Sequence, residues 1–265
     1  MIGRSLAFEG YGASVRLDMP YRMDLASLKS YVAPELSVEE CTDGPPDLLL
    51  TCWNGVCHLV VGERRYGPFR TEDNVFRGVA NGIHYLIAKR SPMTFLHAAA
   101  VELDGGAVVF PGRSRSGRST LAATLVGQGC GYLSDEYAVV SPEGTVFPLS
   151  KPIRLRCEDG AHYLNPPGVG APGGLSCQSV ILARYERGAA WNPKPLSTGR
   201  AILGVLASAA RNLDAPDQVL QAVSSMVRAA ICYEVVRGEG EQPTAMAIRE
   251  LEGVAGLRDK AEVVS

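Results

Sequence analysis

Residues 110–120 read FPGRSRSGRST, and they decide how the rest of the chain is interpreted. The stretch has the Gly-x-x-x-x-Gly spacing and the Ser-Thr ending of a phosphate-binding loop, although Arg118 stands where that motif carries lysine. The apolar run GAVVF before it predicts a strand, and STLAATLVGQG over residues 119–129 predicts a helix. Strand, glycine loop and helix in this order favour an α/β fold with a phosphate site at the loop.

Such a loop binds phosphate mainly through its main chain. Successive N–H groups point inward, and the following helix presents its unpaired N-terminal N–H groups to the anion. We expect the Ser119 hydroxyl to bind Mg2+ and Arg118 to supply positive charge, through a planar guanidinium in place of a compact ammonium. The competing interpretation is a surface turn without a ligand. The nucleotide-binding candidates are Gly112, Arg113, Ser114, Arg115, Ser116, Gly117, Arg118, Ser119 and Thr120.

An acidic pair, Asp135 and Glu136, follows the predicted helix in the run YLSDEYAVV. Ligands of an α/β sheet gather beyond the carboxyl ends of its strands, so an acid that ends a strand near the loop strand can reach the metal or the attacking group. Adjacent acids in a turn are often only solvated, and the loop upstream is what favours a functional role here. The candidates are Asp135 with Ser119 for the metal, and Asp135 and Glu136 for catalysis.

Two further groups carry a weaker signal. His97 lies in the apolar run FLHAAAV, where a histidine is more often a core residue bonded to the backbone than a catalyst. In PLSKPIRLR, strand alternation places Arg154 and Arg156 on one face. These basic residues are expected either at a solvated strand edge or as a clamp on phosphate or substrate, for which Lys151 and Arg154 are the candidates.

The remaining patterns predict two domains, a small N-terminal α+β domain over residues 1–91 and a nucleotide-binding domain over residues 92–265. In the first, Asn54-Gly55 between DLLLTCW and CHLVVG predicts a β-hairpin, and Thr71 starts a predicted helix. In the second, residues 157–176 are rich in glycine and proline and predict a surface loop. Residues 199–230 carry two helical patterns that are broken near residues 214–216.

Composition excludes several classes of protein. The formal net charge of -2 gives no reason to expect nucleic acid as a partner, and no apolar run approaches the ~20 residues that span a bilayer. The seven cysteines are scattered and no apolar leader precedes them, so we expect reduced thiols in a cytoplasmic protein. Cys52 and Cys57, beside His58, lack the second cysteine-rich half of a closed zinc site.

Residues 93–156, with FLHAAAVELDGGAVVFPGRSRSGRSTLAATLVGQGCGYLSDEYAVV at their centre, resemble the core of the HPr serine kinase/phosphorylase family. The likeness is greatest to its short relatives in bacterial biosynthetic clusters, including lasso-peptide clusters. It implies a compact P-loop kinase core of the type shared with phosphoenolpyruvate carboxykinases, and it implies ATP and Mg2+. Further along the chain, CYEVVRG matches more loosely.

The resemblance also implies roles for individual residues. His97 matches a histidine near the active site, Ser119 the magnesium-binding hydroxyl, and Asp135 with Glu136 a pair of aspartates that bind metal and activate the accepting serine hydroxyl. Lys151 and Arg154 fall near a basic segment without an assigned role. The sequence departs from the family in two ways. Arg118 replaces the loop lysine, and the longer C-terminal signature of the family is absent. HPr is therefore not expected as the substrate.

The sequence thus predicts a cytoplasmic, ATP- and Mg2+-dependent kinase that transfers the γ-phosphoryl group to a hydroxyl. The acceptor is expected to be a serine of a peptide or protein, such as a ribosomal-peptide precursor, or else a small molecule. Two alternatives remain: an ATP hydrolase or switch, and a nucleotide-binding scaffold in which Arg118 has removed the transfer activity. Homo-oligomerisation is compatible with each of these.

Overall fold

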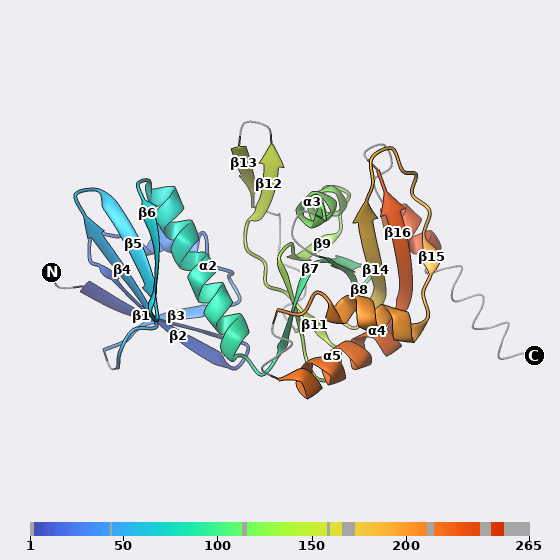
Figure 1. The fold of residues 1–265 in the computed structure, drawn as a ribbon, viewed down its shortest axis with the longest axis horizontal. Helices are drawn as coiled ribbons and strands as arrows, with labels where there is room; N and C mark the ends of the chain where they lie inside the picture. Colours follow the sequence, from blue (N-terminus) through green and yellow to red (C-terminus); the bar gives the residue numbers. More distant parts are fainter. Residues whose placement is uncertain are drawn as a thin grey trace, which may run out of the picture. The chain divides into compact units, whose positions relative to one another are not determined.

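The computed structural model describes residues 3–42, 44–112, 116–157, 160–165, 173–210, 215–238 and 245–251. The chain has a mixed α/β fold that divides into two compact units, Met1–Met93 and Thr94–Ser265. Figure 1 shows the first unit in blue to turquoise and the second in green to red. Among the described residues, no helix is long and apolar enough to cross a membrane.

The first unit is built on a six-stranded sheet with the strand order β3-β1-β2-β4-β5-β6. Neighbouring strands are antiparallel except β2 and β4, which are parallel and pair only at Leu17 with Leu48 and Asp18 with Leu49. The elements are β1 (Gly3–Gly10), β2 (Ala13–Pro20), α1 (Leu25–Lys29), β3 (Ser37–Glu40), β4 (Leu48–Trp53), β5 (Val56–Val61), β6 (Arg64–Phe69) and α2 (Glu72–Arg90).

Helix α2 covers this sheet, and Figure 1 shows it lying along the strands. It forms because apolar residues recur at helical spacing, and Val75, Val79, Ile83 and Ile87 are at most 3% exposed. Thr71 caps the helix, since its hydroxyl oxygen accepts a hydrogen bond from the N–H of Asn74 at 3.3 Å. The helix and its polar start are as the sequence predicts.

The predicted hairpin at Asn54-Gly55 is also confirmed. Asn54 and Gly55 have φ angles of +48° and +76°, the left-handed values that a two-residue hairpin turn requires. With the turn fixed at two residues, Trp53 pairs with Val56 and the strands β4 and β5 follow in register from there.

The same register overturns the expectation that all cysteines are reduced. Cys52 lies directly opposite Cys57, and the two are joined by a disulfide with their Cα atoms 4.1 Å apart. Residues that face each other on two antiparallel strands are near enough for such a bond. The sequence positions of the cysteines do not show this proximity, because it arises from the pairing of the two strands. The described residues leave four free thiols, at Cys41, Cys130, Cys177 and Cys232.

The second unit contains an eight-stranded sheet in the order β11-β10-β7-β8-β14-β16-β15, with β9 also paired to β7, and a separate β12-β13 hairpin. Its elements are β7 (Thr94–Leu103), β8 (Gly106–Pro111), α3 (Arg118–Gly127), β9 (Gly131–Ser134), β10 (Tyr137–Val140), β11 (Val146–Phe147), β12 (Ile153–Cys157), β13 (Gly160–Leu164), β14 (Cys177–Tyr185), β15 (Lys194–Pro195), α4 (Thr198–Leu206), α5 (Pro216–Ala229) and β16 (Ile231–Arg237).

The sheet of the second unit is covered on both faces. Leu96, Ala98 and Ala100 of β7 pack into a cluster with α4 and α5, whereas Ala99 and Val101 pack into a second cluster with α3. Figure 1 shows α3 on one side of the sheet and α4 with α5 on the other. A strand buried on both faces is apolar almost throughout, which explains the continuous run FLHAAAV.

The carboxyl ends of three strands meet at one edge of this sheet. Strands β8 and β16 are both parallel to their shared neighbour β14. The glycine loop follows β8, so it leaves the sheet at the edge where β16 ends with Arg237. In α/β sheets this edge is where ligands bind.

The prediction of an irregular loop over residues 157–176 is wrong in part. Gly160–Leu164 forms strand β13, which pairs with β12 from Ile153 opposite Leu164 to Cys157 opposite Gly160. Tyrosine favours a pleated strand and a neighbouring strand offers hydrogen-bond partners, so pairing outweighs the glycine- and proline-rich composition of the wider segment. Residues 166–172 lie outside the described part of the chain.

Candidate functional site

The glycine loop connects β8 to α3 as the motif requires. The N–H of Gly112 donates to the carbonyl of His97 at 3.0 Å, which ties the start of the loop to β7. Gly117 precedes α3 with a φ of +80°, a left-handed conformation that glycine adopts readily. Gly117 offers no side-chain cap, and the first N–H groups of any helix have no acceptor within the helix itself. Arg113, Ser114 and Arg115 lie outside the described residues.

The loop helix and the acidic pair are joined by a direct hydrogen bond. The Ser119 hydroxyl donates to Oδ2 of Asp135 at 2.8 Å, and the Tyr132 hydroxyl donates to Oδ1 at 3.2 Å. The main-chain N–H of Arg154 adds a longer contact to Oδ2 at 3.4 Å. Asp135 is 5% exposed, so this buried carboxylate is held by three donors from α3, β9 and β12.

Arg118 extends toward the acidic pair. Its Nη1 donates to the main-chain carbonyl of Glu136 at 3.3 Å. Burial lowers the pKa of this guanidinium, and the nearby Asp135 and Tyr137 act in the opposite direction. The side chain of Arg118 thus passes beside Gly112, at the start of the loop, and its guanidinium lies near the acidic pair.

Lys151 forms an ion pair with the carboxylate of Glu136. Burial lowers the pKa of the Lys151 ammonium, while Asp135 raises it and the charges of Arg154 and Arg118 lower it further. The single proton of the Tyr132 hydroxyl is shared between the carbonyl of Lys151 at 2.9 Å and Oδ1 of Asp135 at 3.2 Å. Glu136, the second acid of the pair, is therefore paired with Lys151, which lies in the segment before β12.

His97 lies on β7 directly opposite Tyr137 of β10, with their ring centroids 4.8 Å apart. Burial lowers the pKa of the imidazole, and the charge of Arg118 lowers it further. His97 is thus an uncharged ring beside Arg118 at neutral pH, on the strand β7 whose carbonyl at this residue accepts from the Gly112 N–H of the loop.

Two candidates from the sequence do not join this group through their side chains. Thr120 is exposed on α3, and its carbonyl accepts from the Thr124 hydroxyl at 2.9 Å within the helix. The Arg154 side chain is exposed, and only its main-chain N–H reaches Asp135. The side chain of Arg156 lies outside the described residues.

Arg237 is a residue of this region that the sequence reasoning missed. It ends β16 with an exposed fraction of 4%, and its Nη2 donates to the carbonyls of Ser116 and Gly117 at 3.3 and 3.2 Å. An arginine that ends an apolar strand parallel to the strands around the loop is a signal that could have been used, since such strand ends converge.

Ser119 and Asp135 fit the ligand chemistry of Mg2+. This ion takes oxygen ligands and usually keeps several waters, so one carboxylate and one hydroxyl suffice when substrate phosphates supply the rest. The 2.8 Å between the two side-chain oxygens places both donors at one point. No group of three or more His, Cys, Asp or Glu side chains that could hold a metal ion occurs among the described residues.

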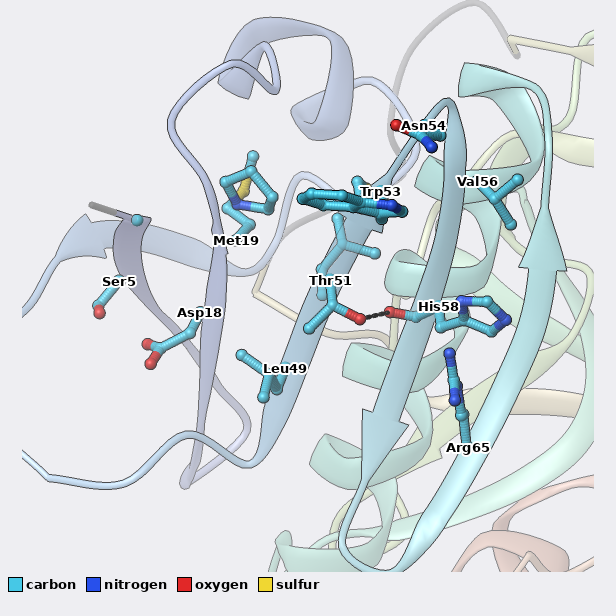
Figure 2. Close-up of a pocket in the computed structure, with 14 residues that line it drawn as sticks. Ser5, Asp18, Met19, Leu49, Thr51, Trp53, Asn54, Val56, His58 and Arg65 are labelled. Atoms are coloured by element: carbon cyan, nitrogen blue, oxygen red, sulfur yellow. Dashed lines mark hydrogen bonds between the residues drawn. The ribbon is translucent and has the colours of Figure 1, made fainter. Parts of the chain in front are cut away.

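A separate groove of about 770 Å3 lies in the first unit. Figure 2 shows it beside β4, with Trp53 at its rim, and the hydroxyl of Thr51 donates to the carbonyl of His58. It opens where the short pairing of β2 with β4 has ended, beyond Asp18 and Leu49. None of the candidate residues from the sequence lines this groove.

No protein-family model matches the chain, and no curated protein matches its sequence. Among solved structures, the fold is distantly similar to that of the HPr(Ser) kinase/phosphatase from Coxiella burnetii. The TM-score is 0.36 and the sequence identity 11%, over 64% of this chain and 97% of the other. Similarity at this level assigns neither an activity nor a residue.

Proposed function

We propose that this protein is a kinase that transfers the γ-phosphoryl group of ATP, with Mg2+, to a hydroxyl group. The acceptor is a serine of a peptide or protein, or else a small molecule. The observation that carries the proposal is the hydrogen bond from Ser119 to Asp135, because it unites the end of the glycine loop with the acidic pair. Metal-binding hydroxyl, carboxylate and helix N-terminus are the parts that phosphoryl transfer needs.

In the proposed reaction the acceptor oxygen forms a bond to the γ-phosphorus, and the bond from that phosphorus to the β,γ-bridging oxygen breaks. ADP leaves, and the proton of the acceptor hydroxyl passes to the carboxylate of Asp135 or Glu136. The loop N–H groups and the first turn of α3 bind the phosphates. Ser119 and Asp135 hold Mg2+, which neutralises phosphate charge when bound.

A second candidate is a nucleotide-binding protein that does not transfer phosphate. The ion pair of Lys151 with Glu136 favours it, because a carboxylate paired with a cation is a weaker base. Arg118, which contacts the Glu136 carbonyl, adds a further positive charge on that side. In this reading Asp135 still holds the metal, but no carboxylate accepts the acceptor's proton.

A transfer assay separates these functions. The full chain is incubated with Mg2+ and ATP labelled at the γ-phosphate, with and without serine-containing peptides, and label is followed on peptide and as free phosphate. Label on the peptide supports the kinase, whereas free phosphate without an acceptor supports a hydrolase. Binding of labelled ATP without either product supports the non-transferring protein.

Asp135→Asn tests the site itself. The variant keeps the size of the side chain and loses the charge, so transfer is expected to fall by about a hundredfold or more if this carboxylate holds the metal. Asp217→Asn is the matched control, because Asp217 is an exposed residue in the first turn of α5. If Asp135→Asn remains folded by circular dichroism and transfers phosphate at the wild-type rate, the assignment is wrong.

A further inference from the structure

The loop region contains a buried cation that the motif does not account for. Arg237 is 4% exposed, and burial lowers the pKa of its guanidinium. No carboxylate among the described residues forms an ion pair with it, and its neighbours are the Ser116 and Gly117 carbonyls and the Tyr185 ring, 5.9 Å from Cζ. A buried charge without a counter-ion costs free energy, which an anionic ligand would offset.

Two polar atoms beside Gly117 lack a hydrogen-bond partner within the described part of the chain. They are Nε of Arg237 and the hydroxyl oxygen of Ser116, and both atoms are buried. Arg237 contacts Gly117, which follows Ser116 and is the residue before the ten-residue helix α3, whose N-terminus is itself favourable for an anion. Unsatisfied donors at a helix N-terminus are what an oxyanion would satisfy.

The position that normally supplies the loop cation is used differently here. Arg118 turns to the carbonyl of Glu136 and lies near Asp135, so its charge is on the side of the carboxylates. Arg237 reaches the loop from the end of β16, 120 residues further along the chain, at the carboxyl edge shared by β8, β14 and β16.

We propose that Arg237 is the phosphate-binding cation of this site and replaces the loop lysine that the chain lacks. The ligand is the polyphosphate of a nucleotide. The inference rests on the proposed nucleotide site and adds the residue that supplies its charge. Arg237 has two tasks: Nη2 holds the loop through two carbonyls, and the remaining donors face the anion.

Calorimetric titration of the full chain tests this proposal. The probes are Mg2+ with ATP and, because it has no base or sugar, inorganic triphosphate. Arg237→Met is expected to weaken the binding of both probes about ten- to hundredfold, the cost of a lost hydrogen bond to a charged group. Arg237→Lys restores part of the affinity because it keeps the charge.

Arg184→Met is the matched control. Arg184 lies on the neighbouring strand, one position before the partner of Arg237, but it is exposed and pairs with Glu186. Its loss should leave both affinities unchanged, and thermal unfolding of each variant verifies its folding.

The outcomes separate the two proposals. If the wild type binds both probes and a folded Arg237→Met variant binds them equally well, the role of Arg237 is overturned and the nucleotide site stands. If the wild type binds neither probe, both proposals fail. If Arg237→Met does not fold, Arg237→Lys takes its place. Retained binding by Arg237→Lys supports Arg237 as the phosphate-binding cation. If the lysine variant folds without binding either probe, or also fails to fold, Arg237 is a structural residue.

Discussion

Gly117 has a left-handed backbone conformation and also lies very close to the guanidinium of Arg237. A Cβ atom there would lie 1.8 Å from Nη2 of Arg237, and the φ angle of +80° disfavours any side chain. Gly105 offers a matched position, with a φ of +83° and nothing within 4 Å of the added atom. Alanine substitutions at these two glycines therefore separate the free-energy cost of the left-handed backbone from the cost of contact with Arg237.

We expect Gly105→Ala to lower the free energy of unfolding by about 1–2 kcal/mol, the left-handed backbone cost. Gly117→Ala should lower it by about 1–3 kcal/mol more, because the guanidinium must move. Urea denaturation measures both. Equal losses at the two positions would show that Arg237 does not restrict position 117.

His97 provides a residue-scale test of where the charge of Arg118 lies. Burial and this charge both lower the pKa of His97 below its ordinary value of 6.5. Nuclear magnetic resonance titration of the imidazole should show this, and Arg118→Gln should raise the pKa toward 6.5. An unchanged titration in Arg118→Gln would place the guanidinium elsewhere.

The lowered pKa of His97 also determines the direction in which the free energy of unfolding changes with pH. Between the lowered folded pKa and 6.5, the unfolded chain binds more protons at His97 than the folded chain does. The contribution of His97 to stability is therefore complete above pH 6.5 and is lost as the pH falls through this interval. A His97→Gln variant, which does not titrate, should show a shallower loss there.

At the scale of elements, helix α2 depends on a cap that is formed by one hydroxyl. Thr71→Ala removes the acceptor for the Asn74 N–H and should cost about 1 kcal/mol in the free energy of unfolding. Ser197→Ala is the control, because Ser197 precedes α4 without a side-chain capping hydrogen bond. Its effect should be a few tenths of a kcal/mol at most. Comparable losses at both positions would argue against the cap.

The β4-β5 hairpin makes a chemical prediction. Because Cys52 and Cys57 are bonded, reduction of the unfolded protein should expose two more titratable thiols than the unreduced protein has. Cys52→Ser should abolish the difference and leave Cys57 free. Seven thiols before reduction would mean that no disulfide forms in the isolated protein.

The elements that could be predicted from the sequence are those that depend on local patterns. Apolar spacing determined α2, and Asn54-Gly55 determined the hairpin turn. Strand β13 and the disulfide were missed because each depends on which segment lies opposite, and this follows only from strand pairing. Within the site, Arg237 was missed for the same reason, since β16 reaches the loop through the shared neighbour β14.

At the scale of the whole molecule, the candidate site belongs to one unit. Every described residue of it lies within Thr94–Ser265, and the groove in Figure 2 belongs to Met1–Met93. Hydrogen exchange of the full chain with Mg2+ and ATP should therefore slow most in residues 116–137 and in β16. If the largest changes appear in β1 to β6, nucleotide binds to the first unit instead.

Gly117 and Arg237 are 120 residues apart in the chain, yet neither position is independent of the other. A glycine loop transplanted alone into another protein would leave behind the side chain that holds two of its carbonyls. A useful graft from this protein must carry the end of β16 together with residues 110–120. A smaller side chain at position 237 would in turn remove the contact that helps to reserve position 117 for glycine.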